Sequence, residues 1–110
     1  MKMKKFINDP ENLTPELLEG FAEAHKDLVR LGDERMVINR KLDEADRETN
    51  VTQGGSGHEP AISGFVGEGM VDISVVGDVF AAPGPKACVD AIKMADKGKE
   101  IGRASCRERV

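Results

Sequence analysis

A run of seven residues at positions 54–60, Gly-Gly-Ser-Gly-His-Glu-Pro, constrains the structure of this chain more than any other segment. Glycines adopt backbone angles that other residues avoid, and they leave their N–H groups uncovered. Such a run brings bare backbone close to a ligand, and here it sets an imidazole beside it. Histidine is the side chain best suited to move a proton near neutral pH. The run therefore predicts a site for a small polar ligand, held by backbone amides next to His58.

Segments with helical and strand patterns alternate on both sides of this run. Thr14 and Pro15 predict the start of a helix that continues to residue 28 with one apolar face. Further strands are expected over 35–39, 50–53 and 71–76, and further helices over 60–66 and 85–96. Residues 40–48 are nearly all charged and predict a solvated connection. This order is typical of an α/β fold with a partly parallel sheet and flanking helices.

The last ten residues, 101–110, differ from the rest of the chain. They carry Arg103, Arg107 and Arg109 against one acidic residue, and their apolar positions show no clean period. An α/β chain should form another strand after the helix over 85–96, but the pattern predicts none here. We therefore interpret residues 1–100 as the N-terminal part of a larger layered domain. Residues 101–110 are interpreted as an atypical basic tail that is foreign or frameshifted.

Composition excludes several classes of function. The chain has 110 residues, which suits one small domain, and a net charge of −4 with neither Trp nor Tyr, which argues against a nucleic-acid partner. It contains no apolar run long enough to span a bilayer. Cys88 and Cys106 lack the spacing of metal ligands or of a disulfide framework. We therefore expect a cytoplasmic protein without a metal site or a membrane anchor.

The block GGSGHEPAISGFVGEGMVDISVVGDVFAAP, residues 54–83, resembles the ketone-binding subunit or domain of the dihydroxyacetone kinase family. The likeness begins at Lys4 and extends to about Lys99. It implies that residues 1–100 hold dihydroxyacetone or a related short ketose for phosphoryl transfer. It also implies that this chain binds no cofactor, because the phosphoryl donor, either ATP with Mg²⁺ or a phosphorylated partner protein, would sit on another domain or subunit. A homo-oligomer is implied for the full-length protein.

The resemblance implies roles for four residues of the glycine run. His58 would act in acid–base chemistry at the ketone, and Gly55, Ser56 and Gly57 would contact its oxygens together with His58. From the pattern alone, His58 could also be a loop histidine with satisfied hydrogen bonds. The family usually has glycine where this chain has Gln53. Its second, ketone-anchoring histidine has no counterpart here, because the other histidine, His25, lies on the predicted first helix as a core or boundary residue.

Three functions therefore remain open. The first is the substrate-binding portion of a dihydroxyacetone kinase-like phosphotransferase. The second is a regulatory homologue that senses a ketone or sugar without phosphorylating it. The third is an inert truncated fragment. In each case we expect the 110-residue chain to be inactive as a kinase, because the sequence contains no recognisable donor site.

Overall fold

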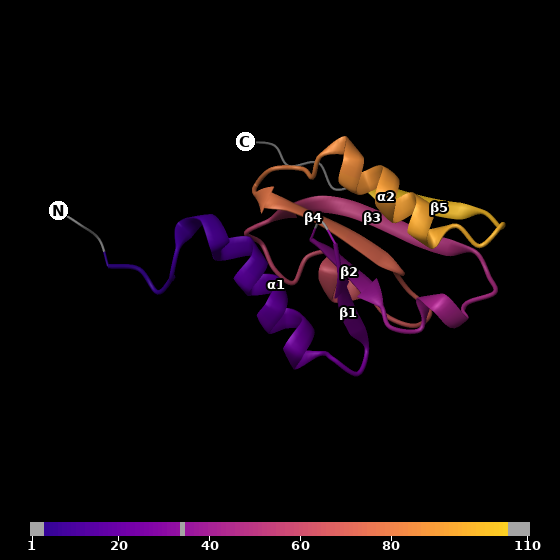
Figure 1. The fold of residues 1–110 in the computed structure, drawn as a ribbon, viewed down its shortest axis with the longest axis horizontal. Coiled ribbons are helices and arrows are strands. Elements are labelled where there is room, and N and C mark those ends of the chain that lie inside the picture. Colours follow the sequence, from indigo (N-terminus) through magenta and orange to yellow (C-terminus); the bar gives the residue numbers. More distant parts are fainter. Residues whose placement is uncertain (1–3, 34, 106–110) are drawn as a thin grey trace.

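A five-stranded sheet with a long helix on each face forms the centre of the computed structural model, which describes residues 4–33 and 35–105 (Figure 1). The elements in chain order are η1 (Pro10–Asn12), α1 (Leu13–Ala24), β1 (Val29–Gly32), β2 (Met36–Asn39), η2 (Leu42–Glu44), β3 (Thr49–Ser56), η3 (Ser63–Phe65), β4 (Ile73–Val79), α2 (Pro85–Ala95) and β5 (Ile101–Ser105). The predicted α/β class is confirmed.

The sheet is mixed, with strand order β1-β2-β4-β3-β5. β1, β2 and β4 are joined by antiparallel pairing, whereas β3 runs parallel to both β4 and β5. Because β3, β4 and β5 run parallel, their carboxyl ends lie at the same end of the sheet. The glycine run lies at this end.

Alternation along the strands divides the buried side chains between two cores. Ile38, Val51 and Val75 lie on one face, where Ala91 and Ala95 of α2 cover them. The other face is covered by α1, whose Leu18 packs against the neighbouring apolar side chains Val29, Val37, Val66 and Val76. Each helix thus buries a stripe of the same sheet, which is the arrangement expected for a layered α/β domain.

The first helix is shorter than predicted. α1 ends at Ala24, and residues 25–28, which the sequence had placed in the helix, form a turn that leads into β1. Val29 is buried as the first residue of β1, whereas Leu28 is 58% exposed. The helical spacing therefore continued by chance into the turn that precedes β1. Thr14, predicted to cap the helix, lies inside α1 and is buried.

Two predictions about strands are wrong in instructive ways. β3 is longer than expected, because Gly54, Gly55 and Ser56 continue the strand and are buried. β5 occupies residues 101–105, where we expected no strand. It pairs with β3 from Thr49 opposite Ile101 to Gln53 opposite Ser105. As an edge strand, exposed after Ile101, it needs no apolar alternation. Residues 106–110 of the predicted tail, with Cys106, lie outside the described residues.

Two connections also differ from expectation. The helix predicted over 60–66 is reduced to the single turn of η3, which follows a cis peptide bond at Glu59–Pro60 and a positive φ of 62° at Ile62. The charged connection over 40–48 is mostly exposed, but its Leu42 is fully buried in the core under α2. Across the described part of the chain, no helix has the length and apolar character needed to cross a membrane.

A buried carboxylate that the sequence did not reveal joins three strands. Asp72, just before β4, is fully buried, and its two oxygens accept hydrogen bonds from Arg47 at 2.7 and 3.0 Å. They also accept from the Asn50 backbone N–H at 2.9 Å and from Asn39 Nδ2 at 3.2 Å. These donors come from β2, from the start of β3 and from the segment before it, so Asp72 fixes the ends of neighbouring strands together.

Candidate functional site

The predicted site lies at the carboxyl end of β3. Gly54, Gly55 and Ser56 are the last residues of this strand, and Gly57 and His58 follow it immediately. In α/β sheets, ligands bind outside the carboxyl ends of parallel strands. The adjacent parallel strand β4 ends at Val79, and its register shifts against β3 between Gly54 and Ser56. The fold therefore places the glycine run where a ligand site is expected.

Two glycines of the run are required by packing within the protein. A Cβ on Gly55 would lie 2.9 Å from the backbone nitrogen of Ala81. A Cβ on Gly57 would lie 3.1 Å from Val79 Cγ1 and 3.2 Å from Phe80 Cζ, and the φ of Gly57 is 105°, which favours glycine. These two glycines are thus needed because their backbone packs closely against the end of β4 and the turn that follows it, whether or not a ligand is bound.

The imidazole of His58 is half-buried and lies beside that turn. Its ring meets the ring of Phe80 edge-on, with 6.1 Å between the ring centres. The next residue, Glu59, is exposed, and its carboxylate accepts the backbone N–H of Gly57 at 3.0 and 3.2 Å. The backbone N–H of Gly57 in the predicted site therefore donates to carboxylate oxygens, which here belong to the Glu59 side chain.

The hydroxyl of Ser56 faces the interior. Ser56 is 1% exposed, and its Oγ lies 3.1 Å from Thr14 Oγ1 of α1 and donates to the carbonyl oxygen of Gly77 at 3.2 Å. Its own carbonyl oxygen accepts the N–H of Phe80 at 2.8 Å. Ser56 thus joins α1, β3 and the turn after β4, and its side chain points away from the exterior.

Gln53, the departure from the family pattern, faces α2. Its Oε1 accepts a hydrogen bond from Cys88 Sγ at 2.7 Å, and its Nε2 donates to Ser105 Oγ of β5 at 3.4 Å. Gln53 therefore joins α2 and the edge strand to β3, with the Cys88 thiol as the hydrogen-bond donor from α2.

His25 is not the core or boundary residue that the helical pattern predicted. Because α1 ends at Ala24, His25 caps the helix with its backbone and is exposed, and its ring makes a tilted contact with that of Phe21, with 4.9 Å between the ring centres. It lines a cavity of about 360 Å³ between the end of α1 and the segment after His58, together with Pro60 and Gly64. The two histidines therefore lie in separate surroundings.

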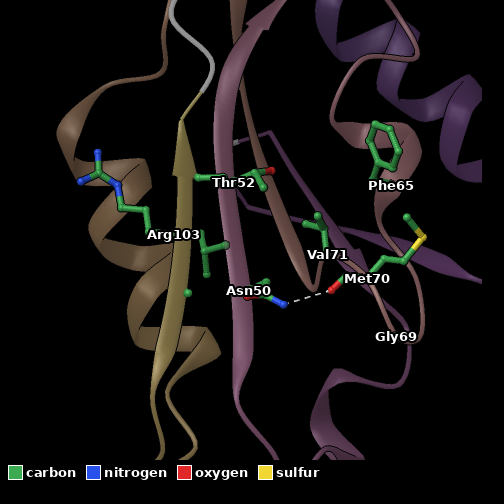
Figure 2. A pocket seen from close by; sticks show the side chains of 10 residues that line it. Asn50, Thr52, Phe65, Gly69, Met70, Val71 and Arg103 are labelled. Carbon is green, nitrogen blue, oxygen red and sulfur yellow. Dashed lines mark hydrogen bonds between the residues drawn. The ribbon is translucent and has the colours of Figure 1, made fainter.

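A cavity of about 500 Å³ opens on the sheet face opposite α2, at β3 and β5 (Figure 2). Asn50 and Thr52 of β3 line one side, and Phe65 and Met70 line the other, where both are more than half exposed. Asn50 Nδ2 donates to the Met70 carbonyl at 3.4 Å, whereas Arg103 points away from the cavity. Within the described ranges, Thr52 Oγ1 is the buried side-chain polar atom that has no hydrogen-bond partner. His58 does not line this cavity.

No group of three or more His, Cys, Asp or Glu side chains in residues 4–33 and 35–105 is arranged to hold a metal ion. Arg35 and Asp78 form a charged pair, and both side chains line a cavity of about 210 Å³ beside the start of α2. Asp78 of β4 thus pairs with the residue before β2.

Several known proteins are similar to this chain in sequence and in fold. The dihydroxyacetone-binding subunit DhaK of the PTS-dependent dihydroxyacetone kinase of Lactococcus lactis is 41% identical over 101 residues, which cover 92% of this chain and 30% of the relative. A solved structure described as the regulation of the dha operon of Lactococcus lactis superimposes with a TM-score of 0.80 at 30% identity, covering 92% of this chain and 31% of that one.

A second solved structure, the dihydroxyacetone kinase of C. freundii in complex with AMP-PNP and Mg²⁺, superimposes with a TM-score of 0.78 at 25% identity over 94% of this chain and 25% of that one. This chain therefore spans less than a third of the length of these relatives. The model of the Dak1 domain matches residues 19–102, which include β1 to β4, α2, the glycine run and the start of β5. By this match, the chain belongs to the Dak1 domain family.

Proposed function

We propose that this chain is the ketone-binding portion of a dihydroxyacetone kinase-like phosphotransferase. The observation that carries the proposal is the likeness of 92% of the chain to a dihydroxyacetone-binding subunit. The position of His58, directly after the carboxyl end of β3, supports it, because this is where a parallel sheet binds small ligands.

Phosphoryl transfer requires little covalent chemistry from the protein and depends on positioning, charge stabilisation and a base at the accepting hydroxyl. His58 is the base in this proposal: it takes the proton from the ketone's hydroxyl as that oxygen attacks phosphorus. Alternatively, it assists proton transfer while a nitrogen nucleophile from another segment or subunit adds to the ketone carbonyl to form a hemiaminal. Gly55, Ser56 and Gly57 contribute backbone groups to the ketone's oxygens. Since the Gly57 N–H already donates to the Glu59 carboxylate, a substrate oxygen would take the place of that carboxylate.

The phosphoryl donor belongs to another domain or subunit in this proposal. One relative is named as PTS-dependent, and one solved relative was crystallised with an ATP analogue and Mg²⁺, so both kinds of donor occur among proteins similar to this chain. This chain's own contribution is to hold the acceptor and to receive its proton.

The experiment uses the subunit from Lactococcus lactis with its matching segment replaced by residues 1–102 of this chain, supplied with its phosphoryl donor. Formation of dihydroxyacetone phosphate is measured for this chimera and for two histidine variants. His58→Ala should lower kcat about a hundredfold or more, which is the usual contribution of a general base. His25→Ala is the matched control and should leave kcat unchanged, because His25 lies on the far end of α1.

An unchanged kcat in the His58→Ala variant would remove His58 from the proposed role. The regulatory alternative is tested in the same chimera: dihydroxyacetone that binds without turnover while the donor is present would favour a sensor over a kinase portion.

A further inference from the structure

Phe80, in the turn after β4, has a backbone conformation that its type rarely adopts. Its φ is 53°, in the left-handed region, where a side chain with a Cβ is strained. The surrounding backbone holds it there: its N–H donates to the Ser56 carbonyl at 2.8 Å, and the next N–H, of Ala81, donates to the Asp78 carbonyl at 3.0 Å. A glycine would form the same turn without strain.

Burial of the ring does not explain why phenylalanine occupies this position. The residue is 52% exposed and belongs to neither core cluster of the described chain. Its ring instead lies across the glycine run. Phe80 Cζ would be 3.2 Å from a Cβ on Gly57, and the ring meets the imidazole of His58 edge-on at 6.1 Å.

Strained backbone of this kind persists where the rest of the structure enforces it, and it gathers at functional sites. Here the strain directs an exposed aromatic ring at the one imidazole of the glycine run. Edge-on aromatic contacts have a preferred geometry, so the ring restricts how the imidazole can turn. Gly57, with its own positive φ, leaves the room that the ring needs.

We propose that Phe80 is a positioning residue that holds the His58 imidazole in the orientation from which it accepts the proton of the ketone's hydroxyl. The inference rests on the proposed function. Phe80 acts through His58 and need not touch the reacting atoms, so its loss affects the chemical step more than ketone binding. Misplacement of a catalytic group by about 1 Å can cost about a hundredfold in rate.

The test compares Phe80→Leu, Phe80→Tyr and Phe65→Leu in the chimera described above. Phe80→Leu should lower kcat about tenfold to a hundredfold with KM changed by less than about threefold. Phe80→Tyr retains the ring and should keep most of the rate. Phe65→Leu is the matched control, since Phe65 is similarly exposed, at 55%, but lies in η3, and it should leave both constants unchanged.

A second measurement follows the imidazole directly in the 110-residue chain by NMR. Loss of the Phe80 ring in the Phe80→Leu variant should shift the ring-proton resonances of His58. It should leave those of His25 in place, because the aromatic ring that His25 contacts is that of Phe21. The chain has two histidines, so the assignment is direct.

The outcomes separate the two proposals. If His58→Ala abolishes turnover while Phe80→Leu leaves kcat unchanged, or raises KM alone, the positioning role is wrong and the proposed function stands. If Phe80→Leu leaves the His58 resonances unmoved, the contact on which the inference depends is absent. If His58→Ala itself leaves kcat unchanged, the proposed function fails first, and a decrease in Phe80→Leu would then report a role independent of His58.

Discussion

Asp72→Asn should destabilise the chain far more than the loss of a surface charge. The carboxylate is 0% exposed and accepts four hydrogen bonds, two from Arg47 and one each from Asn50 N–H and Asn39. The asparagine side chain has an NH₂ group in place of one carboxylate oxygen, so at least one of these N–H donors would face another donor and lose its hydrogen bond. Breaking a buried ion pair by removing one partner costs about 3–5 kcal/mol. Since the Arg47 side chain is 41% exposed and can be solvated, we expect the lower end, about 3 kcal/mol.

Removal of the other partner has a different consequence. Arg47→Met leaves the carboxylate of Asp72 buried with the two asparagine donors alone, so it should cost about as much as Asp72→Asn. The double variant should be less destabilised than the sum of the two single variants, because no charge is then left buried without its partner.

The same network predicts how stability depends on pH. Burial by itself would raise the pKa of Asp72, but the hydrogen bonds from Arg47, Asn50 and Asn39 outweigh it and hold the pKa below its ordinary value. A carboxyl group with a lowered pKa in the folded state stabilises the fold above its unfolded pKa, and this contribution disappears as the pH falls through the folded pKa. The wild-type chain should therefore lose stability progressively below about pH 4, and this loss should be smaller in Asp72→Asn.

Urea unfolding followed by far-UV circular dichroism is the suitable assay, because the chain contains neither Trp nor Tyr as a fluorescent reporter. Hydrogen exchange at the Asn50 amide, which donates to Asp72, gives a local measurement. Glu68→Gln is the control, since Glu68 pairs with Lys41 at the surface and its loss should hardly move the unfolding midpoint. The reasoning is refuted if Asp72→Asn and Glu68→Gln have equal midpoints, or if the acid transition is the same with and without the Asp72 carboxyl.

Two further predictions concern buried hydroxyls and the activity of the chain. Thr52→Val removes the buried Oγ1 that has no partner in the described structure and should stabilise the fold by about 1 kcal/mol. Thr49→Val removes a 2.9 Å hydrogen bond to the Ala95 carbonyl and should destabilise the fold by about 1 kcal/mol. Equal urea unfolding midpoints for the two variants would contradict this contrast. The purified 110-residue chain should form no ketone phosphate from dihydroxyacetone with ATP–Mg²⁺ or with a phosphorylated donor protein, because positioning supplies roughly 7–11 kcal/mol in well-oriented reactions and an incomplete site loses most of it. Product above the no-protein background that disappears in His58→Ala would overturn this prediction.

The sequence predicted those elements whose patterns are local. α2 was expected over 85–96 and spans Pro85–Ala95, because a proline start and a regular apolar face need no information from elsewhere in the chain. β1 and β5 could not be recognised in the same way. β1 has four residues and directly follows a segment with helical spacing, and β5 is an exposed edge strand whose conformation is set by pairing with β3.

The glycine run was recognised from the sequence, but its structural setting was only partly predicted. A strand was expected directly before the glycine run, and the structure continues that strand through Ser56. The packing of Gly55 and Gly57 depends on a turn more than twenty residues later, which no local pattern reveals. The buried position of Ser56 depends in the same way on Thr14, and that of Asp72 on Arg47. Their roles follow from the tertiary pairing of distant segments.

The contact between the hydroxyls of Thr14 and Ser56 couples the position of α1 to that of the glycine run in a thermodynamic sense. Thr14 belongs to α1, while Ser56 lies between the two glycines that shape the backbone beside His58. Suppose that a ligand of the glycine run and a second molecule bound elsewhere each bind better to one position of α1. Binding of the second molecule must then change the affinity of the glycine run for the ligand. Reciprocity then requires the ligand to change the affinity of that molecule by the same factor. Leu13 and Leu17, each more than a third exposed on α1, lie on the helix through which such a linkage would act.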